Sequence, residues 1–149
     1  MNETIQTILT RRSIRSFKEQ PIAKEDLDLM IQAALHAPSG MGLQTWQFTV
    51  ITNPEKIQSL AKAISSVLNR SGYDMYRPGE DDACALENIF LAAHSLGIGS
   101  VWINQLQGIC DEPAVRAILK EFRIPDDHIV YGMAALGYAA AAPSEKERI

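Results

Sequence analysis

The feature that most constrains the fold is a long apolar stretch in the second half of the chain. Residues 81–97 (DDACALENIFLAAHSLG) carry apolar side chains at helical spacing. The main ones are Leu86, Ile89, Phe90 and Ala93. We predict a largely buried helix that ends at Gly97, because glycine readily adopts the left-handed conformation found after helices. Residues 98–104 (IGSVWIN) are typical of a buried strand, so this helix and strand are expected at the centre of the core.

Amphipathic spacing predicts further helices on either side of this centre. A short N-terminal helix, with Ile5, Ile8 and Leu9 on one face, is expected to end near the arginines that follow it. Another is predicted over 23–37, with acidic residues in its first turn, where they suit the helix dipole. Asn53 and Pro54 are typical cap and first-turn residues for a helix that runs to Leu68. The last helix is predicted over 111–122.

Strands and loops complete the predicted order. Alternating apolar residues predict a strand over 46–52 (WQFTVIT), and a second apolar run predicts one over 128–138 (HIVYGMAALGY). Turn-forming residues predict a loop over 69–80. The tail beyond 138, alanine-rich and then charged, is expected to be disordered or to lie on another surface. Helices and strands alternate irregularly, which favours an α+β class or a mixed three-layer α/β arrangement. A chain of 149 residues predicts one domain, residues 1–149.

Charge and composition narrow the partners. The formal net charge of −4 argues against broad binding to nucleic acid or to an anionic membrane surface. No window approaches the roughly 18 apolar residues of a membrane-spanning helix, and the N-terminus lacks the apolar core of a signal peptide, so a soluble cytoplasmic protein is expected. Cys84 and Cys110 are too few for a disulfide scaffold or a zinc site, and we expect both to be reduced, with no bound metal.

Side-chain catalysis has little support in the sequence. The glycine-rich nucleotide loops, the serine-hydrolase elbow and the HExxH zinc motif are all absent. His36, His94 and His128 stand far apart in the sequence and are interpreted as structural residues. We therefore do not expect hydrolysis catalysed by protein side chains.

The strongest candidate site is the basic stretch LTRRSIRSFK, residues 9–18. Arg11, Arg12 and Arg15 surround Ser13 in a chain that is otherwise acidic. Arginine forks suit phosphate, although such a cluster is also compatible with a solvated surface. In extended chain, alternate residues project to one side, so Arg11, Ser13 and Arg15 can project to the same side, which favours the anion-binding interpretation.

Four ordered motifs together resemble the nitroreductase family of flavoproteins. They are TRRSIRSF, APSGMGLQTWQF, DDACALENIFLAAHSLGIGSVWIN and the terminal LGY…KER, which cover nearly the whole chain. The resemblance implies an α+β fold with a central, mostly antiparallel mixed sheet flanked by helices, and an intertwined homodimer with FMN at the interface. It also implies electron transfer from NADH or NADPH to nitroaromatics, quinones or similar acceptors by a ping-pong cycle, with the chemistry carried by FMN.

The resemblance also implies roles for individual residues. The phosphate, ribityl chain and pyrimidine edge of FMN are assigned to Arg11, Arg12, Ser13 and Arg15. A loop from the partner subunit is expected to lie against the cofactor through Pro38, Ser39, Gly40 and Gln44. Contacts near the ring edge that receives hydride are assigned to Trp102, Ile103, Asn104 and Gln105. The basic pair assigned to the phosphate from the tail is Lys146 and Arg148.

Two departures from the family pattern leave alternatives open. Gly42 and Thr45 stand where the family commonly has asparagine and proline. The segment 69–80 is shorter than in the family, so a strand is shortened or missing, either as a natural deletion or as an absent piece, and a four-stranded or locally altered sheet is expected. A flavin-binding protein that stores, senses or delivers FMN is an alternative function. A relative that carries out another reductive or oxidative step, such as dehalogenation, is a third.

Overall fold

The computed structural model describes residues 1–68 and 80–143, which form two compact units. Within the described residues, the first unit comprises 1–44, 80–103 and 133–143, and the second comprises 45–68 and 104–132. The chain order is α1 (Glu3–Thr10), α2 (Lys24–Leu35), the 3₁₀ turn η1 (Gly40–Gly42), α3 (Pro54–Leu68), α4 (Glu80–Ser95), β1 (Gly99–Ile103), α5 (Pro113–Glu121) and β2 (Met133–Gly137).

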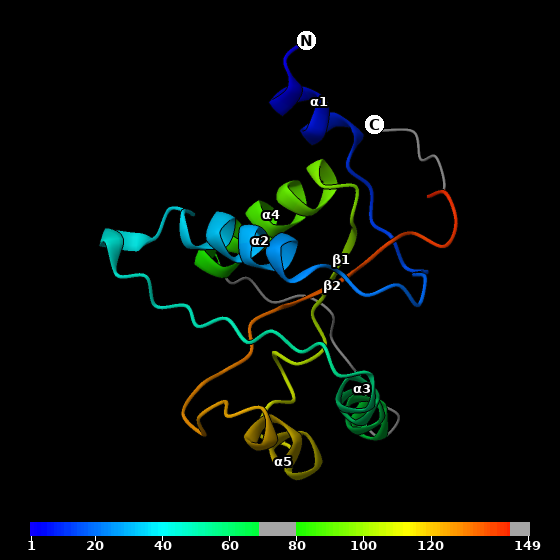
Figure 1. Ribbon diagram of the computed structural model, residues 1–149. Coiled ribbons are helices and arrows are strands. Elements are labelled where there is room, and N and C mark those ends of the chain that lie inside the picture. The colour runs from blue at the N-terminus through cyan, green and yellow to red at the C-terminus, as the bar shows by residue number, and fades with distance from the viewer. Residues whose placement is uncertain (69–79, 144–149) are drawn as a thin grey trace. The chain divides into compact units, whose positions relative to one another are not determined.

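Helix α4 is the centre of the first unit. Leu86, Ile89 and Phe90 are buried along it, and the small residues Ala85 and Ala93 are fully buried. Helix α2 packs alongside α4, as Figure 1 shows, and Asn88 Nδ2 on α4 donates a 2.8 Å hydrogen bond to an α2 carbonyl. The predicted central buried helix is therefore confirmed. Gly97 follows it with φ +74°, as expected of a residue that ends a helix.

A small antiparallel sheet lies next to α4. Strands β1 and β2 pair from Gly99 opposite Gly137 to Ile103 opposite Met133. Two isolated bridges attach the N-terminal segment: Ser13 pairs in parallel with Ser100, and residue 17 pairs antiparallel with residue 139. The α+β class is confirmed. Within the described residues the sheet has two strands, so the altered form of the expected sheet is present and the four-stranded form is not.

Two glycines bring the N-terminal segment close to this sheet. Gly99 and Gly137 are direct partners in the β1–β2 register. A Cβ on Gly99 would lie 2.8 Å from Ile14 Cγ1, and one on Gly137 would lie 2.9 Å from Phe17 Cδ1. Such distances are too short for any larger residue without a shift of the neighbour, so the absence of a side chain at both positions allows the close approach.

The second unit is built on α3 and α5, which pack against each other. Leu60 and Val67 on α3 and Val115 and Leu119 on α5 are buried. The predicted cap of α3 is confirmed, because Asn53 Oδ1 accepts hydrogen bonds of 2.9 and 3.1 Å from the first-turn N–H groups.

Side chains rather than strands fix the loop after α5. Arg116 donates to the carbonyls of Pro125 and His128, each at 3.2 Å, and pairs with Asp111 at 2.6 Å. The Cys110 thiol donates to Leu106 O at 2.9 Å. Cys110 Sγ also accepts a 3.3 Å hydrogen bond from the backbone N–H of residue 130. One guanidinium and one thiol therefore provide partners for main-chain groups at Pro125, His128 and residue 130 of this loop.

Two strand predictions differ from the structure: one segment forms no strand, and the other strand is shorter than predicted. The segment 46–52 forms no strand. Trp46 and Phe48 are half-buried between exposed neighbours, as alternation predicts, but Val50, the next apolar residue of the pattern, is exposed. A strand needs a backbone partner, and the described part of the second unit has no strand to pair with it. The strand predicted over 128–138 is shorter, because pairing with the five-residue β1 begins only at Met133.

Two other predicted segments lie largely outside the described residues. The loop predicted over 69–80 falls there except for Glu80, which belongs to α4. The tail beyond residue 143 also lies outside them. Within the residues that are described, no helix combines the length and apolar character needed to cross a membrane.

Candidate functional site

The arginine segment, residues 11–15, is an extended stretch between α1 and the sheet. Ile14 is buried and its N–H donates a 2.9 Å hydrogen bond to Ser100 O on β1. Ser13 and Arg15, on either side of it, are exposed. This is the alternation predicted for extended chain, in which Ser13 and Arg15 project away from the side that Ile14 buries. Anchoring at Ser100 therefore presents a hydroxyl and a guanidinium next to each other.

The three arginines differ in what already holds them. Arg12 Nη1 donates to the carbonyls of Leu9 and Arg11, at 2.9 and 2.8 Å, and so caps the C-terminal end of α1. Arg11 lies 3.8 Å from Glu87 and 5.9 Å from the centre of the Phe90 ring. The guanidinium groups of Arg11 and Arg12 therefore already contact other parts of the protein.

Arg15 is different from these two. It is exposed, and among the described residues no carboxylate or carbonyl forms an ion pair or hydrogen bond with its guanidinium. An arginine with no protein partner retains its full set of donors for a ligand. Within the described residues, Arg15 and Ser13 are thus the side chains of the segment most accessible to a ligand.

The predicted ring-binding residues of β1 lie on the same strand as the anchor. Trp102 is two residues beyond Ser100. The residue is 39% exposed, and its ring centre lies 6.2 Å from that of Phe90 on α4. Ile103 pairs with Met133 in the β1–β2 register. Trp102 is thus partly core, yet it leaves an apolar surface that a flat ligand can cover.

The predicted partner-subunit loop, residues 38–44, lies elsewhere in the first unit. In Figure 1 it continues from the C-terminal end of α2, away from the dark blue arginine segment. Ser39 Oγ accepts a 3.2 Å hydrogen bond from the N–H of Gln44 and closes the loop on itself. Pro38 and Gly40 are exposed, so backbone and side chains of this loop are accessible. One copy of the chain does not bring this loop to the arginine segment.

The remaining predicted residues lie in the second unit or outside the described residues. Asn104 and Gln105 directly follow β1 and begin the second unit's last segment. Gln105 Oε1 is shielded from solvent and accepts no hydrogen bond from the described residues. A buried acceptor of this kind suits a ligand N–H group. The predicted phosphate contacts of Lys146 and Arg148 lie outside the described residues.

Sequence reasoning missed two structural supports of the segment. Glycines within apparent strands are a recognisable sign of close backbone approach, and the glycine pair of β1 and β2 carried that sign. The hydrogen bond between Thr10 Oγ1 and His94 Nε2, at 2.8 Å, joins residues 84 positions apart and has no sequence signature. His36 and His128 likewise have neighbouring partners, a main-chain carbonyl and the Asp127 carboxylate.

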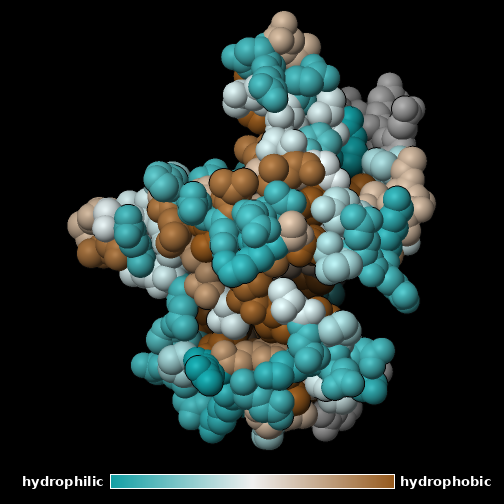
Figure 2. Space-filling model, viewed as in Figure 1, coloured by the Kyte–Doolittle hydropathy of each residue, from teal (hydrophilic) through white to brown (hydrophobic). Residues whose placement is uncertain are grey.

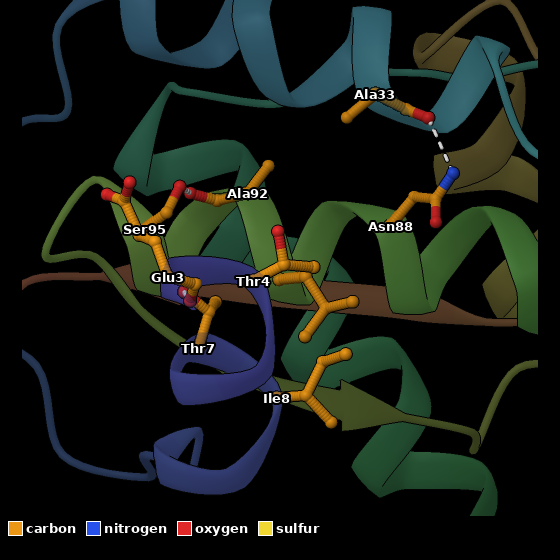
Figure 3. A pocket seen from close by; sticks show the side chains of 9 residues that line it. Glu3, Thr4, Thr7, Ile8, Ala33, Asn88, Ala92 and Ser95 are labelled. Atoms are coloured by element: carbon orange, nitrogen blue, oxygen red, sulfur yellow. Dashed lines mark hydrogen bonds between the residues drawn. The ribbon is translucent and has the colours of Figure 1, made fainter. Parts of the chain in front are cut away.

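A separate cavity of about 440 Å³ lies between α1, α2 and α4. Figure 3 shows Thr4, Thr7 and Ile8 of α1 opposite Asn88 and the following turns of α4. Glu3 is the one ionisable residue among its lining, and no predicted site residue reaches it. Its chemistry does not suit an anion. No group of three or more His, Cys, Asp or Glu side chains gathers as a metal site within the residues 1–68 and 80–143.

Comparison with known proteins identifies the family. The sequence pattern of the nitroreductase family matches residues 8–82 and 80–138. The FMN reductase [NAD(P)H] of Bacillus subtilis is 31% identical over an alignment of 183 residues, gaps included. The alignment covers all of this chain and 71% of that protein. The chain therefore belongs to the nitroreductase family.

Solved structures agree with this assignment. A nitroreductase of Bacteroides fragilis with bound FMN is 38% identical, with a TM-score of 0.89 over 100% of this chain and 95% of that one. An FMN-dependent nitroreductase of Clostridium difficile is 29% identical, with a TM-score of 0.77 over 96% of this chain and 91% of that one. The nitroreductase fold predicted from the motifs is confirmed.

Proposed function

We propose that the protein is an FMN-dependent oxidoreductase. In this proposal it takes electrons from NADH or NADPH and passes them to nitroaromatics, quinones or similar acceptors in a ping-pong cycle. The observation that carries the proposal is the open pair of Ser13 and Arg15, anchored to β1 through Ile14 and Ser100. The FMN-bound relative of Bacteroides fragilis, similar over the whole chain, supports FMN as the ligand.

The residues fit FMN in donor chemistry. A phosphate needs cations and N–H or O–H donors, which the arginine segment supplies. The partly exposed Trp102 offers an apolar surface for a flat ring system. Gln105 Oε1, which accepts no hydrogen bond from the described residues, is proposed as an acceptor for an N–H group. The remaining proposed contacts are Arg11, Arg12, Pro38, Ser39, Gly40, Gln44, Ile103, Asn104, Lys146 and Arg148.

In this proposal FMN supplies the hydride and electron chemistry, and the protein supplies position and electrostatics. Arg15 and Ser13 bind the phosphate, and Arg12 keeps the start of the segment attached to α1. A guanidinium close to a site that gains negative charge stabilises that charge without any proton transfer. No side chain is asked to act as a general acid or base.

We further propose that the protein acts as a homodimer. Helix α1 has no buried residue, and its apolar side chains Ile5, Ile8 and Leu9 are exposed. Figure 2 shows apolar side chains at the surface among polar ones. Apolar helix faces of this kind usually pack against another surface, and a second copy would also supply the loop 38–44. Sedimentation should give the mass of a dimer, and an FMN-bound monomer would contradict this part of the proposal.

Steady-state kinetics test the proposed activity. The purified protein, supplied with FMN, should oxidise NADH or NADPH in the presence of a quinone or a nitroaromatic. Double-reciprocal plots at several acceptor concentrations should give parallel lines, as a ping-pong cycle requires, whereas converging lines would refute that cycle. FMN binding without nicotinamide oxidation would instead identify a flavin-storage or flavin-delivery protein.

A further inference from the structure

Thr10 and His94 form the link on which this inference depends. Thr10 Oγ1 lies 2.7 Å from Gln6 O and 2.8 Å from His94 Nε2. A hydroxyl has a single proton, and a backbone carbonyl only accepts, so that proton must go to Gln6 O. The oxygen is then an acceptor toward His94. The imidazole must therefore carry a proton on Nε2 and donate it to Thr10.

The link belongs to a row of contacts along one face of α4. Glu87, Phe90 and His94 occupy positions i, i+3 and i+7, which lie on the same side of a helix. Glu87 and Phe90 contact Arg11, at 3.8 Å and 5.9 Å, and His94 contacts Thr10. Because α1 has no buried residue, apolar packing does little to fix where it ends. These contacts therefore set the start of the arginine segment.

The other end of the segment has its own anchor. The Ile14 N–H is bonded to Ser100 O on β1 at 2.9 Å. Only residues 11–13 lie between this anchor and Thr10. A chain fixed at both ends of so short a stretch has few conformations left, so the orientation of Arg11, Arg12 and Ser13 depends on both attachments.

We propose that Thr10 and His94 are positioning residues for Arg11, Arg12 and above all Ser13, the part of the arginine segment that precedes the Ile14 anchor, with His94 donating from Nε2. This inference rests on the proposed function, because the anion is taken to be the phosphate of FMN. Thr10 and His94 touch neither the phosphate nor the reacting atoms. They act by holding the segment in the conformation that binds the phosphate.

Paired variants with FMN and riboflavin test the inference. Thr10→Val and His94→Leu remove the link, and Thr10→Ser and His94→Gln keep a hydroxyl and an N–H donor in place. Since one hydrogen bond contributes about 1 kcal/mol, each disrupting variant should weaken FMN binding by about fivefold. Riboflavin, which lacks the phosphate, should bind these variants as it binds the wild type. The conservative variants should retain wild-type affinity for FMN.

The results separate this inference from the proposed function. Wild-type protein that does not bind FMN would refute both. Wild-type protein that binds FMN while Thr10→Val binds it equally well would refute only the positioning role. Equal weakening of FMN and riboflavin would indicate a general structural role and would also overturn it.

The proton assignment has an independent readout that needs no ligand. Nitrogen-15 NMR of the histidine side chains, recorded above the pH at which imidazole is charged, distinguishes the two neutral tautomers. The Nε2–H tautomer is expected for His94, and His94→Gln marks its signal by removing it. An Nδ1–H tautomer would contradict the link.

Discussion

The two units satisfy their backbones in different ways. In the first unit, distant segments pair through main-chain atoms, as in β1 with β2 and Ser13 with Ser100. In the second unit, Arg116 and Cys110 hold the loop after α5 through their side chains. The second unit therefore uses an arginine for structural contacts, whereas Arg15 of the first unit has no ion-pair or hydrogen-bond partner among the residues that the structure describes. The partners of a cation, more than its presence, indicate whether it is available for a ligand.

The largest effect is expected from removing the structural arginine. The Arg116 side chain is only 11% exposed, and its loss removes the side-chain donor to the His128 carbonyl and one of the two donors to the Pro125 carbonyl, which keeps the His128 N–H. Arg116→Ala should lower the free energy of unfolding by about 2–3 kcal/mol, measured by urea denaturation. Arg116→Lys keeps the positive charge but loses the forked guanidinium donors. Its free energy of unfolding should lie between those of the wild type and Arg116→Ala. If Arg116→Ala left the free energy of unfolding unchanged, the Arg116 side chain would not be what stabilises the loop after α5.

A substitution at the Gly99–Gly137 pair tests whether main-chain pairing holds the arginine segment against β1. The new Cβ of Gly99→Ala would meet Ile14 Cγ1 at 2.8 Å and push the arginine segment away from β1. We expect a loss of about 1–3 kcal/mol in stability, together with weaker FMN binding. Gly108→Ala, which has no atom within 4 Å, is the control and should change stability by less than about 0.5 kcal/mol. Equal effects at both positions would show that the close approach is unimportant.

The open arginine should affect binding but not stability. Arg15→Gln removes a charge-assisted contact and should weaken FMN binding by about tenfold. The free energy of unfolding should change by less than about 0.5 kcal/mol, because the side chain is exposed. Arg123→Gln removes the same charge from an exposed position of the second unit and should leave FMN affinity unchanged. If Arg15→Gln and Arg123→Gln weakened FMN binding equally, Arg15 would act only through the net charge of the protein.

The smallest effect concerns the thiol of the second unit. Burial raises the pKa of Cys110 above its ordinary value of 9.0, so above that pH the unfolded chain loses a proton that the folded chain keeps. This contribution to stability is complete below pH 9.0 and declines as pH rises through the folded pKa. Urea unfolding at increasing alkaline pH should show a steeper fall for the wild type than for Cys110→Ala. Parallel curves would contradict the assignment.

Much of the fold could be predicted because the signals for a helix come from residues that are close together in the sequence. The apolar spacing of α4 and the Asn53 cap of α3 depend on neighbouring residues and were predicted correctly. Strands were predicted less well, since alternation in 46–52 indicates exposure but not the presence of a partner. Pairing depends on residues far away in the chain, which one sequence does not reveal.

The candidate site also has a part that could be predicted from the local sequence and a part that depends on distant residues. Its arginine segment was recognisable from RRSIR, and the extended conformation matched the predicted alternation. The sorting of its three arginines was not predictable, because Leu9 O, Glu87 and Phe90 are brought to them only by the folded structure. The link from Thr10 to His94 was hidden for the same reason.

The most direct test of the central claim is an equilibrium titration of the wild-type apoprotein with FMN and with riboflavin. If the arginine segment holds the phosphate, FMN should bind at least about tenfold more tightly, because riboflavin lacks the group that Arg15 and Ser13 are proposed to bind. Equal affinities, or a protein that remains colourless with both flavins, would contradict the account.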